Sequence, residues 1–296
     1  MGIISEQVQE ILRKIPPVRV SQTGVKGGSE GGIYKARRRG GTVEFFEHKE
    51  YSPGDDIRSI DWKLYGKREK FYVKEREGEV RLNIYIMIDM SGSMNFEFMG
   101  KTKLQEALII AFSIIYFHLK NQNRIYLLPV SEGKILRTIP IRSEGDFFIW
   151  LKNVEEWKGN GADNFTKLEF DPMSYFSSPG RLFIIGDFLE EGIEEFFVKY
   201  GSLRLLDITP VAVQVLHPYE ISLEYSGRVV LKSMETSEEM EIFPFSMKRR
   251  FKREVEKFLA HVKEFVRSRG IFYFLHIAGE DPAGIIVRIL SEQWST

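Results

Sequence analysis

The chain has 296 residues, of which 43% are hydrophobic and 28% are charged, as in ordinary globular proteins. Its 42 basic and 42 acidic residues cancel, so no overall field draws it toward nucleic acid or an anionic membrane. It has no cysteine, which excludes disulfides, thiolate metal sites and a cysteine nucleophile.

The N-terminal segment lacks the basic leader and apolar stretch that are typical of a signal peptide. The most apolar stretch of the chain, residues 107–117, is shorter than the roughly 20 residues that cross a bilayer. We therefore expect a cytoplasmic protein that does not insert into a membrane itself.

The first 80 residues are expected to form a region separate from the rest of the chain. Ser5 is placed to cap a short amphipathic helix, which Pro16 and Pro17 end. Residues 18–80 are rich in glycine, arginine and aromatic residues and show no helical period, so we expect irregular and β-type structure there.

From residue 81 to residue 296, apolar strands alternate with helices. The predicted strands are 81–89, 124–130, 134–141, 181–187, 207–216 and 270–278. The predicted helices are 103–120 after Thr102, Ser143 to about Val154, 190–200 and about 246–269. A polar hairpin over 219–233 lies in an insertion that ends near 245. This alternation predicts an α/β fold, a doubly wound and mostly parallel sheet.

Oxygen-bearing side chains follow two of the buried strands. Asp89, Ser91 and Ser93 come at alternate positions after the first strand, and Asp187 ends a second one. Ligands bind beyond the carboxyl ends of such strands, and hard oxygen donors suit Mg²⁺ or Mn²⁺. The glycine-rich loop 159–166 could supply one more oxygen. The alternative is a purely structural role, in which these residues only cap helices.

Two motifs resemble known families. The Asp-x-Ser-x-Ser motif after an apolar strand resembles the metal-ion-dependent adhesion site of von Willebrand factor A domains. Residues 47–63, with Tyr-Ser-Pro-Gly-Asp-Asp at 51–56, resemble the signature of a bacterial family known as domain of unknown function number fifty-eight. The resemblance implies an A-like domain and metal positions at Asp89, Ser91, Ser93 and Asp187. It also implies a non-enzymatic adaptor whose protein partner is a MoxR-type AAA+ ATPase or a client of that ATPase.

The middle loop departs from the A-domain pattern, in which a threonine follows the glycines. Here Asp163 aligns best with that position, and Thr166 lies three residues later. With Thr166 as ligand, two carboxylates and a divalent ion give a neutral site that an acidic partner can complete. With Asp163, the occupied site carries one negative charge and resists such a partner. Asp163 could equally be a helix N-cap.

Two rival functions remain open. A Mg²⁺-dependent phosphohydrolase could use Asp89 as nucleophile, but the position expected to hold a general acid is occupied by Ser91, which cannot act as one near neutral pH. The basic clusters at 35–39 and 248–253 could bind nucleic acid. Glutamates follow the second cluster on its helix and the total charge is zero, so we expect no nucleic-acid partner.

Overall fold

The structure, a computed structural model, consists of two compact units, residues 1–24 with 81–296 and residues 25–80. It describes residues 2–14, 45–51, 62–68, 70–76, 81–161, 165–222, 229–232, 239–242 and 244–292. The basic cluster at 35–39 and most of the signature motif therefore lie outside the described residues.

The large unit is built on one seven-stranded sheet in the order β13-β10-β9-β3-β6-β7, with β8 also paired to β6. The parallel strands are β3 (Asn83–Asp89), β6 (Arg124–Ser131), β9 (Gly180–Gly186), β10 (Ile208–Leu216) and β13 (Phe272–Ile277). The predicted strand 134–141 is two short antiparallel ones, β7 (Lys134–Ile135) and β8 (Ile139–Ile141). The predicted doubly wound, mostly parallel sheet is confirmed.

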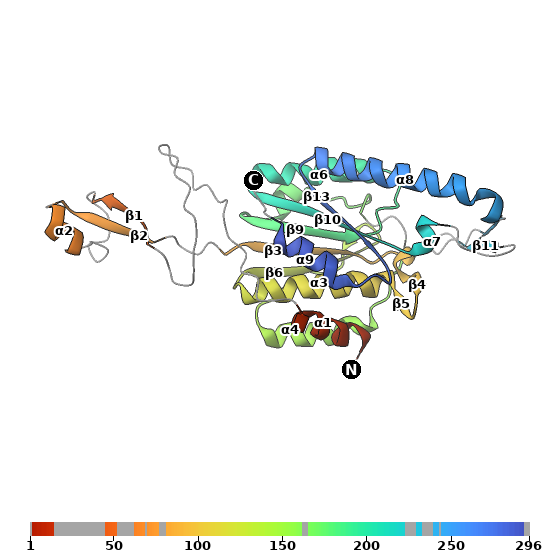
Figure 1. Cartoon of the computed structure of the whole chain (residues 1–296), viewed down its shortest axis with the longest axis horizontal. Helices are drawn as coiled ribbons and strands as arrows, with labels where there is room; N and C mark the ends of the chain where they lie inside the picture. The colour runs from red at the N-terminus through yellow and green to blue at the C-terminus, as the bar shows by residue number, and fades with distance from the viewer. Residues whose placement is uncertain are drawn as a thin grey trace. The chain divides into compact units, whose positions relative to one another are not determined.

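Helices cover both faces of this sheet (Figure 1). On one face, α3 (Lys103–Lys120) and α9 (Pro282–Ser291) pack on the sheet, and α1 (Ile3–Lys14) and α4 (Glu144–Asn153) pack on α3. The other face packs on α6 (Ile193–Gly201) and α8 (Pro244–Ser268), together with the short helices α5 (Pro172–Tyr175) and η4 (Ser202–Leu206). In the parts of the chain that the structure describes, every helix is too short or too polar to cross a bilayer.

Helix α3 begins where the sequence predicts. The Thr102 hydroxyl accepts the Gln105 N–H, and the Gln105 side chain accepts the Thr102 N–H, which completes a capping box. Nearly all of the helix from Lys103 to His118 is buried, because α3 lies between the sheet and helices α1, α4 and α9.

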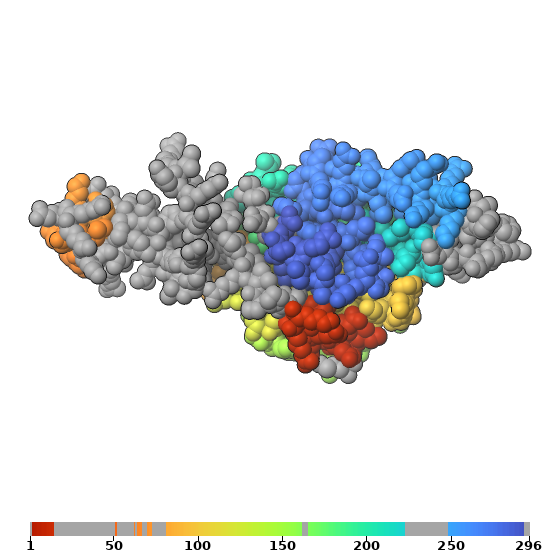
Figure 2. Space-filling view, in the orientation of Figure 1, coloured from red at the N-terminus to blue at the C-terminus, as the bar shows by residue number. Residues whose placement is uncertain are grey.

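Helix α1 belongs to the large unit, although it was expected to belong with the region before residue 80; the boundary at residue 80 itself agrees with the two units. Residues Ile4 and Val8 of α1 are fully buried in the core of the large unit, and Figure 2 shows the helix beside α9. It begins at Ile3 and not after Ser5, since the Glu155 carboxylate accepts the N–H groups of Ile4 (3.2 Å) and Ser5 (2.7 Å). A distant carboxylate therefore satisfies the first turn of the helix.

The small unit contains an antiparallel pair of strands, β1 (Phe45–Glu50) and β2 (Tyr72–Arg76). This agrees with the β-type structure predicted for residues 18–80. It also contains helix α2 (Trp62–Arg68), which was not predicted. Tyr65 stacks on Phe71 with ring centroids 4.5 Å apart, and Trp62 meets both rings edge-on. Aromatic contacts thus fix this short helix where the sequence shows no helical period.

The remaining elements lie in connections of the large unit. Strands β4 (Glu97–Phe98) and β5 (Lys101–Thr102) pair before α3, and α7 (Pro218–Ile221) follows β10. Strands β11 (Val229–Lys232) and β12 (Glu239–Ile242) form an antiparallel pair within the expected insertion. Short 3₁₀ turns, η2 (Gly92–Asn95) and η3 (Val154–Glu156), complete the described structure.

Candidate functional site

Asp89 and Asp187 lie at the carboxyl ends of neighbouring strands. Strands β3 and β9 are parallel, with Ile88 opposite Ile185, so the next residues of both strands reach the same edge of the sheet. Gly186 makes room for Asp89, because a Cβ at Gly186 would lie 2.8 Å from Asp89 Cβ. Both aspartates are almost fully buried. The topology therefore brings together two carboxylates that are 98 residues apart in the sequence.

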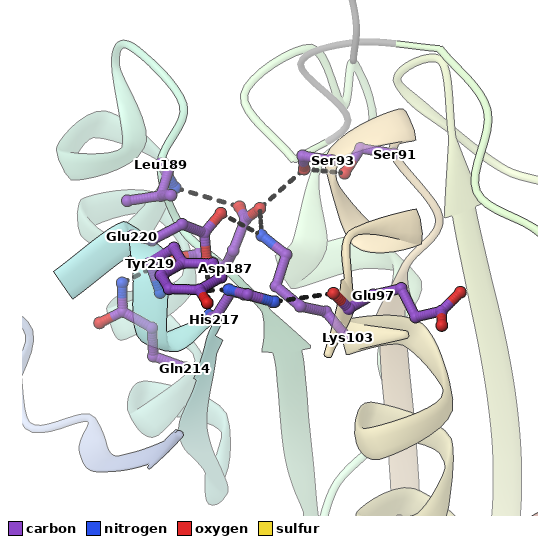
Figure 3. Close-up of polar contacts among 10 residues, drawn as sticks. All are labelled: Ser91, Ser93, Glu97, Lys103, Asp187, Leu189, Gln214, His217, Tyr219 and Glu220. Carbon is purple, nitrogen blue, oxygen red and sulfur yellow. Dashed lines mark hydrogen bonds and ion pairs between the residues drawn. The ribbon is translucent and has the colours of Figure 1, made fainter. Parts of the chain in front are cut away.

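The loop after β3 turns its serines toward Asp187. The Ser91 N–H donates to Asp89 Oδ1 (2.8 Å), which folds the chain back at the end of the strand. Ser91 Oγ lies 3.0 Å from Ser93 Oγ, and the Ser93 hydroxyl donates to Asp187 Oδ2 (2.7 Å). Figure 3 shows this chain of oxygens. The predicted residues Asp89, Ser91, Ser93 and Asp187 thus form one connected cluster.

A buried lysine completes the surroundings of Asp187. Lys103, the first residue of α3, donates from Nζ to Asp187 Oδ2 (2.8 Å) and to Glu220 Oε1 (2.6 Å) (Figure 3). Burial lowers the pKa of Lys103, but the charges of Asp187 and Glu220 outweigh it and hold the pKa above its ordinary value. Lys103 is therefore an ammonium ion at neutral pH.

The segment after β10 holds Glu220 in place. The other carboxylate oxygen of Glu220 accepts the His217 N–H (2.6 Å), which closes a capping box at the start of α7. The His217 ring accepts the Tyr219 N–H at Nδ1 (3.1 Å) and donates from Nε2 to the Glu97 carbonyl (2.9 Å). Both ring nitrogens are thus engaged by backbone groups, as Figure 3 shows, and the ring is not placed to act as a base.

The glycine-rich middle loop is bound tightly to the serine loop. The Asn95 side chain accepts the Gly159 N–H (2.8 Å) and donates to the Gly159 carbonyl (2.9 Å). The Asn160 N–H donates to the Met90 carbonyl (2.6 Å). A Cβ at Gly159 would lie 1.9 Å from Ser91 O, so only glycine permits this approach. We call this set of contacts the Asn95 clasp.

The structure describes only one of the two candidate metal ligands in the middle loop. Asp163 lies outside the described residues. Thr166 is half-buried, and its hydroxyl and its N–H both donate to Glu190 Oε2 (2.9 Å each). Glu190 Oε1 also accepts the Phe165 N–H (3.1 Å). The carboxylate that follows β9 therefore anchors the end of the middle loop, and the choice of middle-loop ligand stays a prediction.

Comparison with known proteins gives the family. Residues 47–264 match the family described as "Protein of unknown function DUF58". The chain belongs to this family. Uncharacterized proteins of Mycobacterium bovis and Mycobacterium tuberculosis are 27% identical to it over 97 residues, which is 33% of this chain and 30% of those relatives. The chain therefore matches less than a third of the length of these relatives.

Solved structures with a similar fold include several proteins at low identity. The conserved hypothetical protein BatB from Bacteroides thetaiotaomicron is 11% identical with a TM-score of 0.41, covering 72% of this chain and 98% of its own. An aerotolerance-related membrane protein from Bacteroides fragilis is 12% identical with a TM-score of 0.42, covering 71% and 98%. The SpRpn10 VWA domain is 11% identical with a TM-score of 0.39, covering 73% and 100%.

The cluster in this DUF58 chain has a donor set that fits Mg²⁺ or Mn²⁺. It offers carboxylate and hydroxyl oxygens only, the donors that these ions prefer. Within the described residues, no three acidic, histidine or cysteine side chains gather as a metal site by themselves. Hydroxyl oxygens would therefore have to complete the shell. Two residues in contact with the site, Lys103 and Asn95, were not predicted. The sequence holds a weak signal for Lys103, because this charged residue lies on the same face of the helix as the apolar residues Ala107 and Ile110.

Proposed function

We propose that this DUF58 chain is a non-catalytic protein-binding module that holds Mg²⁺ or Mn²⁺ and takes a carboxylate from a protein partner. Asp89, Ser91 and Ser93 would ligate the ion, and Asp187 would act through the Ser93 hydroxyl. The bound ion would supply the positive charge that attracts the partner's carboxylate. Ligand exchange at an open position is sufficient for this function, and no bond in the partner is broken.

The spacing of the two serine oxygens carries the proposal. In an octahedron with metal–oxygen distances of about 2.1 Å, neighbouring ligands lie about 3.0 Å apart. Ser91 Oγ and Ser93 Oγ are 3.0 Å apart, next to the buried carboxylate of Asp89. The Ser93 hydroxyl directs its hydrogen at Asp187 and accepts the Ser91 hydroxyl, which leaves one lone pair of Ser93 for an ion.

Binding is favoured over catalysis by the groups around the serines. His217 uses both ring nitrogens on backbone groups, and Lys103 is held as an ammonium ion between two carboxylates. Neither is arranged to take a proton from Ser91 or Ser93. The resemblance of the motifs points to a MoxR-type AAA+ ATPase, or a client of that ATPase, as the protein partner.

A binding assay with purified components tests this function. The chain is immobilised and exposed to a MoxR-type ATPase from the same organism in millimolar Mg²⁺. We expect retention that is lost in EDTA and in Asp89→Ala, and weakened in Asp187→Ala. Retention that survives both EDTA and Asp89→Ala would contradict the proposal and direct attention to the exposed basic residues 248–253 of α8. If the ATPase is not retained, its clients are the next partners to test.

One substitution separates the two readings of the middle loop. If Asp163 is a ligand, Asp163→Thr removes a negative charge that repels an acidic partner, and partner binding becomes tighter. If Asp163 is only a helix cap, Asp163→Thr slightly lowers the free energy of unfolding and leaves affinity unchanged, since threonine is a somewhat weaker cap. Affinity and urea unfolding, measured on the same variant, decide between the readings.

A further inference from the structure

Lys103 is the one lysine among the described residues that is fully buried, with no exposed surface, and it lies inside the cluster that the proposed function uses. Its ammonium group touches two carboxylates: Asp187, which directly follows β9, and Glu220, which lies in α7 after β10. Burying a charge is costly unless it is paired. The ion pairs with Asp187 and Glu220 therefore offset the cost of burying Lys103 and hold its charge beside the serines.

The ammonium group and the Ser93 hydroxyl share one acceptor. Asp187 Oδ2 accepts both of them, at 2.8 Å and 2.7 Å, so the two donors lie within a few ångströms of each other. Asp187 Oδ1 accepts the Leu189 N–H (3.2 Å). Both oxygens of this carboxylate are thus engaged within the protein before any ion arrives. Oδ2, the oxygen beside Ser93, already accepts two hydrogen bonds, so ligation through it would require Lys103 or Ser93 to release it.

We propose that Lys103 is a resident cation that keeps Asp187 out of the inner coordination shell and makes binding of the divalent ion weak. This inference rests on the proposed function and names the residue that sets its metal affinity. The ammonium repels an ion held by Ser93, because like charges a few ångströms apart interact strongly even at a protein-like dielectric. The free chain then gains its ion fully only when a partner's carboxylate adds a further ligand.

Mn²⁺ titration followed by electron paramagnetic resonance tests the proposal without any partner. Lys103→Met removes the ammonium and keeps an unbranched side chain, and we expect Mn²⁺ to bind at least about tenfold more tightly. Lys120→Met is the matched control, since Lys120 lies on the same helix and pairs with Glu144 at an exposed position. We expect its Mn²⁺ affinity to equal that of the wild type. Equal or weaker binding by Lys103→Met would overturn the proposal.

A double variant guards against misfolding and against a trivial effect of net charge. Lys103→Met with Glu220→Gln keeps the net charge of the wild type. In this double variant only the Asp187 carboxylate loses its ammonium partner, whereas in Lys103→Met both Asp187 and Glu220 lose it. Net charge alone predicts unchanged affinity, whereas release of Asp187 predicts tighter binding. A folded double variant that binds Mn²⁺ no more tightly than the wild type overturns the inference. Adding Asp89→Ala must abolish the gain; a gain that persists would mean that the ion has only replaced the ammonium.

The outcomes also separate this inference from the proposed function. If the wild type binds no Mn²⁺ at millimolar concentration but Lys103→Met does, the metal-dependent function fails and the role of Lys103 stands. If the wild type binds and the Lys103 variants bind no better, the proposed function stands and the role of Lys103 fails. If neither the wild type nor the variants bind, both are wrong.

Discussion

Replacing Gly159 with alanine should separate the two loops that form the site. The added Cβ would lie 1.9 Å from Ser91 O, so the middle loop must retreat by more than about 1 Å to reach ordinary contact. That retreat breaks both hydrogen bonds of Asn95 and stretches the bond from Asn160 to Met90. At about 1 kcal/mol for each bond, plus the cost of strain, we expect Gly159→Ala to lower the free energy of unfolding by about 2–4 kcal/mol.

Equilibrium urea unfolding measures this loss, and the chain offers a matched control. Gly284 lies in helix α9 with no atom within 4 Å of an added Cβ. Gly284→Ala should raise the stability by about 0.5–1 kcal/mol, because alanine is the better helix former. If Gly159→Ala is as stable as Gly284→Ala, the Asn95 clasp does not hold the loops together and the reasoning is refuted.

Three further predictions concern pH, the N-terminal helix and catalysis. Burial holds the pKa of His118 well below its ordinary value of 6.5, so only the unfolded chain takes up this proton and stability falls as the pH drops. Between pH 7.5 and pH 5.5, the free energy of unfolding should fall by about 1.4 kcal/mol more in the wild type than in His118→Gln. An equal fall in both proteins would exclude His118 as the cause. Ile4→Ala should cost the large unit about 2–5 kcal/mol in urea unfolding, whereas a negligible loss would mean that α1 is not part of its core. With Mg²⁺, the chain should hydrolyse neither a phosphate ester nor ATP, and turnover that disappears in Asp89→Asn would identify Asp89 as a nucleophile.

Much of the fold could be predicted because local signals and the hydrophobic pattern agree. The apolar run that ends at Asp89 forms a strand buried along its whole length, as parallel strands covered on both faces must be. Thr102 and Ser143 both accept N–H groups from the first turns of the helices they were expected to begin. Where a cap and an apolar period coincide, the element and its start follow from the sequence.

Other elements were missed although signals existed, or depended on distant residues. Asp281 caps α9 and Pro282 stands in its first turn, with Ile285, Ile286 and Ile289 buried, yet the last predicted element ends at 278. The start of α1 could not be predicted, because Glu155 supplies its cap from 150 residues away. Tertiary contacts of this kind override local propensity.

The sequence predicted the cluster of Asp89, Ser91, Ser93 and Asp187, but not the residues that surround it. Parallel strands meet at one edge of a sheet, so Asp89 and Asp187 could be brought together from the pattern alone. The ion pair between Lys103 and Glu220 joins residues 117 positions apart, and it exists only because α3 and α7 converge on the end of β9. A lysine on a buried stripe is a signal that a charged partner is needed, but the sequence does not name the partner.

The most direct test of the metal-dependent site is the melting temperature with Mg²⁺ and with EDTA, for the wild type and Asp89→Ala. An ion at one hundred times its dissociation constant adds about 2.7 kcal/mol to the free energy of unfolding. Because Lys103 is expected to weaken binding, Mg²⁺ should be raised to tens of millimolar, with an equal ionic strength of NaCl as control. We predict that Mg²⁺ raises the melting temperature of the wild type and does not change that of Asp89→Ala. A wild type that melts at the same temperature in Mg²⁺, NaCl and EDTA, or an Asp89→Ala variant that responds equally to Mg²⁺, would contradict the account.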